Sequence, residues 1–194
     1  MISRAIVHWA GSQPSLERRI YFANHSSHLD YLLVLCALPE HARARVRPVA
    51  ASDYWTASVL RRWLASGVFN AVFIDRPHGS AVRAFNPLRP LVDALDAGYS
   101  LVLFPEGTRG SGRQLRPFKA GIFHLVVARP EIELVPVRID NAWRVLPKGH
   151  FAPVPARCAV RFGAPTRLLE GERKDDFLER LRRSIECLGY LKAA

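Results

Sequence analysis

The chain has 194 residues, 49% of them apolar, which suits one globular domain with a hydrophobic core and excludes a low-complexity chain. Its formal net charge of +11 comes from 24 arginines and 4 lysines, so an acidic partner is expected, although solubility alone also explains the charge. No apolar run approaches the roughly 18 residues that cross a bilayer, since the longest spans only residues 31–38.

Six apolar runs of strand length predict β-strands, separated by segments with helical periodicity. The strands are expected at residues 19–23, 47–51, 71–74, 100–104, 134–139 and 158–162. Helices are expected at residues 29–38, 53–66, from Pro87 or Pro90 to Gly98, 117–128 and 175–188. Pro136, inside the fifth strand, indicates an edge strand or a bulge. The alternation predicts an α/β fold, a single layered domain over residues 1–194 with a largely parallel central sheet flanked by helices.

Two segments have tryptophan at the spacing of an amphipathic helix. One runs from Ile2 to Trp9, and the other carries Trp55 and Trp63 within the helix expected at 53–66. Tryptophan close to arginine is typical of a membrane interface, but the same spacing suits a hydrophobic core. For the second segment, both interpretations stay open.

Cysteine usage and the N-terminus bear on the compartment. Cys36, Cys158 and Cys187 are odd in number and match no metal-binding or redox spacing. Cys36 and Cys187 lie among apolar residues, so we expect small buried side chains there. The first residues do not form a signal peptide, because His8 interrupts a short apolar stretch. A reducing cytoplasm is the simplest compartment.

A polar block, NHSSHLD at residues 24–30, follows the first expected strand and leads into a helix. Open α/β sheets place their chemistry beyond the carboxyl ends of strands. His25 and Asp30 would diverge by roughly 140° within one helix, so they can meet only if His25 precedes the helix and Asp30 lies in its first turn. A carboxylate bonded to one imidazole nitrogen would then leave the other nitrogen as a base.

Two other interpretations of this block are open from its residues. Ser27 and Asp30 have the spacing of a capping box, so Asp30 could serve only to cap the helix, and the block alone does not decide between these roles. A zinc site of the metallo-β-lactamase kind, aligned on His28 and Asp30, would need ligands at Ser26 and Tyr31. Those side chains do not match the pattern, so no metal is expected.

Basic residues also follow two further expected strands, at Arg76 and Arg109. Gly107 would let the backbone approach a ligand, and Thr108 adds a hydroxyl. Lys119 falls in the first turn of the helix expected to follow, where backbone N–H groups attract anions. Each is a weak signal alone, but together at adjacent strand ends they suit a phosphate monoester.

In this order the motifs resemble the glycerolipid acyltransferases, whose type member is 1-acyl-glycerol-3-phosphate acyltransferase. That family has the blocks Asn-His-x4-Asp, Ile-Asp-Arg, Phe-Pro-Glu-Gly-Thr-Arg and Val-Pro-Val, with Phe-Lys-x-Gly before the last. The matching residues are Asn24, His25 and Asp30, then 74–76, 104–109, 118–121 and 135–137. The resemblance covers roughly residues 20–140, and all blocks in order are a strong signal where His-x4-Asp alone is weak.

The resemblance implies the following chemistry. His25, oriented by Asp30, would act as general base on the hydroxyl of a lyso-glycerophospholipid, which would attack the thioester of acyl-CoA or acyl carrier protein without an acyl-enzyme. The default acceptor, 1-acylglycerol-3-phosphate, would give phosphatidate. No metal or redox cofactor is expected, because a thioester is already activated. The residues that the resemblance implies in binding the acceptor are Arg76, Glu106, Gly107 and Arg109, and the pattern of the turns adds Thr108 and Lys119 to this expected site.

Two features depart from the family pattern. Ser often follows the third block, where Gly110 stands here, and many members begin with hydrophobic anchoring segments, whereas only 24 residues precede His25. We therefore expect either an anchor beyond this sequence or peripheral binding to the cytoplasmic face of an anionic membrane. This departure concerns membrane attachment and leaves the expected chemistry in place.

Two other functions remain to be separated from acyl transfer. A non-catalytic basic module for nucleic acid or acidic membranes would explain the charge but not the placement of Asp30 and Glu106 among basic turns. No nucleic-acid-binding motif occurs, so nucleic acid is not expected as a partner. A thioesterase could use the same His25–Asp30 pair and would release free fatty acid without an acceptor.

Overall fold

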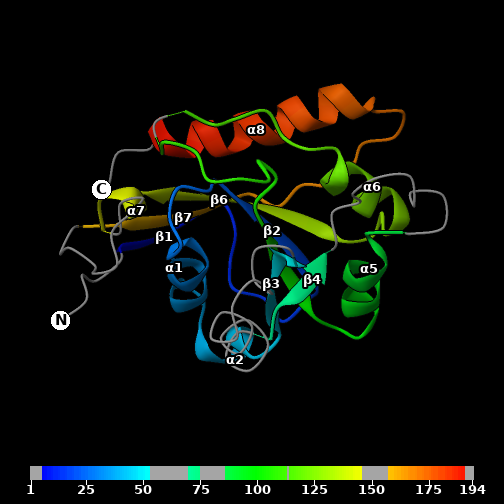
Figure 1. The fold of residues 1–194 in the computed structure, drawn as a ribbon, viewed down its shortest axis with the longest axis horizontal. Helices are drawn as coiled ribbons and strands as arrows, with labels where there is room; N and C mark the ends of the chain where they lie inside the picture. Colours follow the sequence, from blue (N-terminus) through cyan, green and yellow to red (C-terminus); the bar gives the residue numbers. More distant parts are fainter. Residues whose placement is uncertain (1–5, 53–69, 75–85, 113, 146–156, 191–194) are drawn as a thin grey trace.

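The computed structural model describes residues 6–52, 70–74, 86–112, 114–145 and 157–190 (Figure 1). A seven-stranded sheet with the order β1-β7-β6-β2-β5-β3-β4 forms its centre, and every neighbouring pair is parallel except β6 and β7. The strands are β1 (Ile6–Ala10), β2 (Arg19–Ala23), β3 (Val46–Ala51), β4 (Val72–Ile74), β5 (Ser100–Leu103), β6 (Glu133–Asp140) and β7 (Ala159–Gly163). The expected α/β fold with a largely parallel sheet is confirmed.

Helices cover both faces of this sheet. Figure 1 shows α8 running along one side and α1 lying on the other. The two faces follow from the alternation of side chains along each strand: Ile20 and Phe22 of β2 pack with α5, α6 and α8, whereas Tyr21 and Ala23 pack with α1. The described helices are α1 (Asp30–Ala37), α2 (Glu40–Arg43), α5 (Arg89–Asp96), α6 (Gly121–Ala128), α7 (Ala142–Val145) and α8 (Lys174–Tyr190).

All six expected strands are present, but the N-terminal segment is not the helix suggested by its spacing. Ile6–Ala10 forms the edge strand β1, which pairs in parallel with Ala159–Gly163. Trp9 stacks on Phe162 with ring centroids 4.1 Å apart. Backbone pairing and ring stacking against a distant strand therefore outweigh the local periodicity, and they also hold Trp9 against the sheet.

The start of α6 differs from the expectation as well. The helix begins at Gly121 and not at residue 117, so Lys119 does not lie in its first turn. The backbone N–H of Lys119 instead donates to the carbonyl of Pro105 at 2.7 Å, and the neighbouring Phe118 is buried against Phe22. These contacts hold the segment before α6 in a non-helical conformation against the turn after β5.

Pro136 occupies an interior strand and not an edge, because β6 lies between β7 and β2. The pairing is irregular beside this proline: between the pairs Leu134–Thr166 and Val137–Phe162, two residues of β6 face three of the opposite chain, so the additional residue lies in the chain that follows β7. Antiparallel pairing with β7 is interrupted there, so the missing N–H of proline costs no ladder hydrogen bond on that side.

The burial of the cysteines is the reverse of what their neighbours suggested. Cys36 and Cys187 are exposed, and Cys158 is buried. On α1 the buried positions are Tyr31, Val34 and Ala37, which leaves Cys36 on the outward side. The helix expected at 53–66, with its tryptophans, lies outside the described residues. Among the residues that are described, no helix is long and apolar enough to span a membrane.

Candidate active site

The site forms where neighbouring parallel strands end at one edge of the sheet. β2 and β5 are paired in parallel with Phe22 opposite Leu103, so the chains that follow them emerge side by side. The backbone N–H of His25, after β2, donates to Oε1 of Glu106, after β5, at 2.8 Å. Two motifs that are 81 residues apart in sequence are thus joined by a direct hydrogen bond.

His25 and Asp30 meet as the strand–turn–helix arrangement required. Asp30 is the first residue of α1, His25 precedes the helix, and Nδ1 of His25 lies 2.8 Å from Oδ2 of Asp30. The same oxygen accepts the backbone N–H groups of Ser26 at 2.6 Å and Ser27 at 2.8 Å. Asp30 therefore holds the backbone of the turn and also binds the imidazole, while the N-cap residue of α1 is Leu29, without a side-chain capping bond.

The surroundings of the pair favour one tautomer of His25. Oδ2 of Asp30 accepts two backbone N–H groups, so the imidazole nitrogen facing it carries the proton and Nε2 carries the lone pair. No described residue hydrogen-bonds to Nε2, the side chain of His25 is 23% exposed, and Asp30 is fully buried. The imidazole stacks on Phe104 at 4.3 Å, which fixes the plane of the ring. The arrangement is that of a base open to a substrate.

A buried thiol lies within electrostatic reach of this carboxylate. Burial raises the pKa of Cys158 above its usual value, and the negative charge of Asp30 adds to the increase. Cys158 therefore stays a neutral thiol at physiological pH. On the carboxylate itself, Oδ1 has no hydrogen-bond partner among the described residues.

Asn24 fixes the point at which the chain leaves the sheet. Its buried side-chain amide donates to the carbonyl of Ile139 at 2.8 Å and accepts the N–H of Ile139 at 2.7 Å. These two bonds continue the pairing of β2 with β6 beyond Ala23 and Val137. In the sequence, Asn24 belonged to a motif but had no assigned role. Its position directly after a strand could be read from the sequence, whereas the strand that its amide binds could not.

Glycines shape the turn after β5. The N–H of Gly107 donates to the carbonyl of Phe104 at 3.0 Å, and Gly107 has a φ of 70°, a conformation that side chains disfavour. A Cβ at Gly107 would lie 3.3 Å from Cγ of Lys119, so the stem of that lysine crosses the turn closely. At Gly110, whose N–H donates to the carbonyl of His25 at 2.8 Å, a Cβ would lie 3.3 Å from Oε2 of Glu106.

The residues expected to bind an acceptor fall into three groups. Glu106 is buried, whereas Thr108 and Lys119 are exposed and Arg109 is half-buried. Within the described part of the chain, no partner binds the side chains of Thr108, Arg109 or Lys119, so these groups remain available to a ligand. Arg76 lies outside the described residues. The structure thus brings His25, Asp30 and Glu106 into direct contact and places Lys119 against Gly107.

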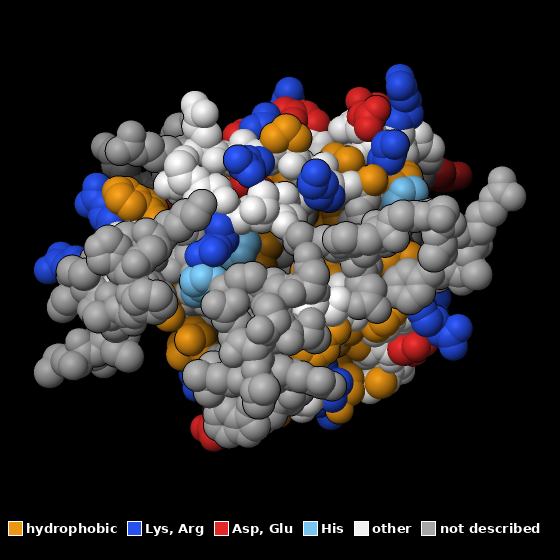
Figure 2. Space-filling model, in the orientation of Figure 1, with side chains coloured by type: hydrophobic (Ala, Val, Ile, Leu, Met, Phe, Trp, Pro, Cys, Tyr) orange, Lys and Arg blue, Asp and Glu red, His pale blue; other side chains and the backbone are white. Residues whose placement is uncertain are grey.

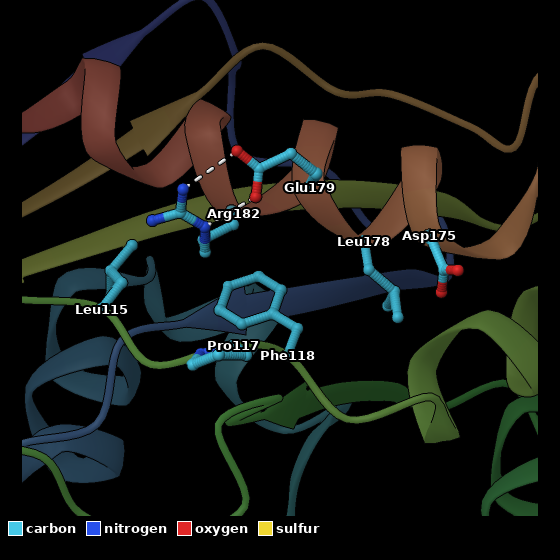
Figure 3. A pocket seen from close by; sticks show the side chains of 7 residues that line it. All are labelled: Leu115, Pro117, Phe118, Asp175, Leu178, Glu179 and Arg182. Carbon is cyan, nitrogen blue, oxygen red and sulfur yellow. Dashed lines mark hydrogen bonds and ion pairs between the residues drawn. The ribbon is translucent and has the colours of Figure 1, made fainter.

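One small cavity and one larger groove lie near this edge. The cavity holds about 10 Å³, roughly one water molecule, and is lined by Asn24, His25, Glu106, Gly112, Gln114, Leu115 and Arg138. The groove, of about 410 Å³, lies between the segment before α6 and helix α8 and is lined by Leu115, Pro117, Phe118, Asp175, Leu178, Glu179 and Arg182 (Figure 3). Leu115 is common to both, but neither His25 nor Asp30 lines the larger groove.

Two further residues lie near the site, although no motif in the sequence includes them. Arg138, on β6, lines the small cavity beside His25 and pairs with Asp140 at 3.0 Å. Gly112 has a φ of 76°, and a Cβ there would lie 2.4 Å from Cδ1 of Trp143, so the chain passes too close for any side chain. The contact between Gly112 and Trp143 depends on how distant elements pack, so it could not be read from the sequence. Glycines at 110 and 112 did indicate a segment in which the backbone turns or packs closely.

Known proteins resemble this chain in sequence and in fold. The 1-acyl-sn-glycerol-3-phosphate acyltransferase alpha of Ovis aries is 31% identical over 94% of this chain and 60% of its own length. The Homo sapiens protein of the same name is 30% identical over 94% and 61%. The fold resembles the crystal structure of the 1-acyl-sn-glycerophosphate (LPA) acyltransferase PlsC from Thermotoga maritima, with a TM-score of 0.71. The match covers 98% of this chain and 75% of that chain at 23% sequence identity, so it shows a likeness of fold.

This chain spans about three fifths of the length of the mammalian relatives it matches. The family model described as Acyltransferase matches residues 5–140, which contain every motif from Asn24 to Val137. The matched region also contains the His25–Asp30 pair and the turn after β5. The chain belongs to this acyltransferase family.

Proposed function

We propose that this chain transfers a fatty acyl group from acyl-CoA or acyl carrier protein to the hydroxyl of a lyso-glycerophospholipid, with 1-acylglycerol-3-phosphate as acceptor and phosphatidate as product. The observation that carries the proposal is the His25–Asp30 pair, with Nδ1 bound at 2.8 Å and Nε2 open among the described residues. The names of the mammalian relatives support this choice of acceptor.

The proposed reaction needs only a base and correct placement. Nε2 of His25 removes the proton from the acceptor hydroxyl as its oxygen attacks the thioester carbonyl carbon. The tetrahedral intermediate then expels the thiolate, which takes the proton from the imidazolium, so an ester forms, a thioester breaks and His25 returns to its starting state. Asp30 stabilises the imidazolium and keeps the ring oriented. No covalent acyl-enzyme is required.

The acceptor phosphate is proposed to bind at the turn after β5. Arg109, Thr108 and Lys119 offer two cations and a hydroxyl, and no described residue pairs with their side chains. Guanidinium groups bind phosphate oxygens through charge-assisted hydrogen bonds. Arg76, after β4, is proposed to add a further cation, although it lies outside the described residues.

Replacing Arg109 by alanine should raise KM for a phosphate-bearing acceptor while leaving kcat close to that of the wild type. Loss of one charge-assisted contact costs about 1.5–3 kcal/mol, which corresponds to a KM increase of roughly 10- to 100-fold. Arg76→Ala should act in the same direction. Steady-state kinetics with varied acceptor and varied donor measure the effect, with Arg89→Ala on the exposed start of α5 as a control. An unchanged acceptor KM with a raised donor KM would place these arginines at the donor instead.

The acceptor headgroup and the donor are tested by direct product analysis. The purified chain is incubated with acyl-CoA or acylated carrier protein and a panel of lyso-phospholipids that differ in headgroup, and products are identified by mass spectrometry. We expect diacyl product with the free phosphate monoester as the preferred acceptor. Free fatty acid formed equally well without any acceptor would indicate a thioesterase and would contradict the proposal.

The acceptor is a membrane lipid, so the chain must reach a bilayer, and we propose that basic residues contribute to docking at an anionic surface. Arg116 and Lys119 lie near the site edge, since the N–H of Arg116 binds Glu106 and the stem of Lys119 lies against Gly107, and Arg109 belongs to the same turn. Figure 2 shows Lys and Arg side chains beside histidines on the face that it presents. Each basic residue near an anionic surface contributes about 1 kcal/mol. The proposed setting is the cytoplasmic face of the membrane.

Vesicle flotation should show binding to anionic vesicles that weakens as salt rises, because salt screens exposed charges. Neutral vesicles should bind poorly at every ionic strength. Replacing Arg116 and Lys119 together by glutamine should reduce binding to anionic vesicles, while glutamine at Arg167, which pairs with Glu133 at the opposite edge of the sheet, should not. Equal binding to neutral and anionic vesicles, or binding to neither, would exclude electrostatic docking.

A further inference from the structure

The carboxylate of Glu106 is buried and fully engaged with the protein backbone. Glu106 is only 2% exposed to solvent. Oε1 accepts the N–H of His25 at 2.8 Å, and Oε2 accepts the N–H of Arg116 at 3.0 Å. The two donors belong to different segments, one after β2 and the other before α6. Glu106 therefore links the turn that carries the base to the segment that passes beside it.

The main chain of His25 is held on its other side as well. Its carbonyl accepts the N–H of Gly110 at 2.8 Å, so residues 106 and 110 bind both backbone polar groups of His25. Asp30 holds the imidazole at Nδ1, and Phe104 stacks on the ring. The base is thus fixed at its backbone by the turn after β5 and at its side chain by α1.

These contacts disfavour a direct role of Glu106 in binding an acceptor. Its oxygens already accept two N–H groups, and the small exposed area leaves little access for a ligand. A carboxylate is also repelled by a phosphate group, in contrast to the neighbouring Arg109. A carboxylate does suit two converging N–H donors, because both of its oxygens accept and neither donates.

We infer that Glu106 is a positioning residue, which sets the place of His25 for catalysis through the backbone and does not bind the acceptor. This inference rests on the proposed function only in that His25 is the base. Its consequence is a separation of kinetic effects within one motif: Glu106 governs kcat, whereas Arg109, three residues later, governs the acceptor KM. An acceptor-binding Glu106 would instead resemble Arg109 in its kinetics.

Three variants test the inference with different geometry. Glu106→Gln keeps the shape but leaves one of the two N–H donors facing an amide that cannot accept it. Glu106→Asp keeps the charge but shortens the reach. Glu106→Ala removes both acceptors. Glu172→Gln is the matched control, because Glu172 also accepts a backbone N–H, from Leu169, and lies far from His25 in sequence on the segment before α8.

We expect kcat to fall about 100-fold in Glu106→Ala, since small displacements of a catalytic group have effects of this size, and about tenfold in Glu106→Gln. The acceptor KM should stay within about twofold of the wild type in both, and the control should match the wild type. A raised acceptor KM with kcat retained would overturn the inference, as would unchanged kinetics in all three Glu106 variants.

A second measurement is independent of turnover. The ¹⁵N chemical shifts of the His25 imidazole report which nitrogen carries the proton, and the signal is assigned by its loss in His25→Gln. We expect a single Nδ1–H tautomer in the wild type and in Glu172→Gln, and a mixed or exchange-broadened signal in Glu106→Gln. An unchanged His25 signal in every folded Glu106 variant would overturn the inference. If the wild type transfers no acyl group, the proposed function fails while this measurement still decides the role of Glu106.

Discussion

Replacing His25 by alanine is expected to lower kcat by about 10²–10⁴-fold, the contribution of a positioned general base. The fold should survive, because the hydrogen bonds of the His25 backbone to Glu106 and Gly110 do not involve the imidazole. Oδ2 of Asp30 would lose one of its three donors and keep the N–H groups of Ser26 and Ser27. The loss of rate therefore reports chemistry and not unfolding.

Steady-state kinetics together with thermal unfolding by circular dichroism check this result. His28→Ala provides the matched control, because His28 is an exposed histidine of the same turn with no assigned role in the reaction. A His25→Ala variant that keeps more than a tenth of the wild-type kcat would show that another group is the base.

Asp30→Asn is the substitution with the second largest expected effect, and it should lower both kcat and stability. Asp30 is fully buried, and three N–H donors converge on one of its oxygens. Hydrogen bonds to a charged acceptor contribute about 1.5–3 kcal/mol each and neutral ones about 0.5–1.5, so we expect a loss of roughly 1–3 kcal/mol in the free energy of unfolding. The neutral amide also removes the charge that stabilises the imidazolium, so kcat should fall by about 10²-fold or more.

The two effects of Asp30→Asn are measured separately, by denaturant unfolding and by kinetics at a temperature where the variant is folded. Asp93→Asn serves as the control, since Asp93 is an exposed acid on α5 that pairs only with Arg89 among the described residues. A stability loss with wild-type kcat would leave Asp30 with a structural role alone, which is the kind of role that its spacing from Ser27 first suggested.

Local patterns were enough to predict six of the seven described strands and the turn that carries the base. The runs that became β2, β5 and β6 are apolar and bounded by polar turns, and the geometry of a strand followed by a helix allowed His25 to meet Asp30. That contact spans five residues, so it depends on local backbone geometry. The fold class followed from the alternation of these elements.

Contacts between distant segments could not be predicted in the same way. β1 forms because Ile6–Ala10 pairs with a strand about 150 residues later, information that its own spacing does not contain. The partners of Asn24 and Glu106 depend on β2 lying between β6 and β5. The family resemblance implied an acceptor-binding role for Glu106, and only the packing shows that its carboxylate faces the backbone.

The role of His25 in acyl transfer is tested most directly by the stoichiometry of one reaction, 1-acylglycerol-3-phosphate with acyl-CoA, in which released CoA and phosphatidate are measured at the same time. We expect one CoA released for each phosphatidate formed, no release without acceptor, and loss of both products in His25→Ala. CoA release that is independent of the acceptor, or phosphatidate formed equally well by His25→Ala, would contradict the claim that His25 activates the acceptor hydroxyl for acyl transfer.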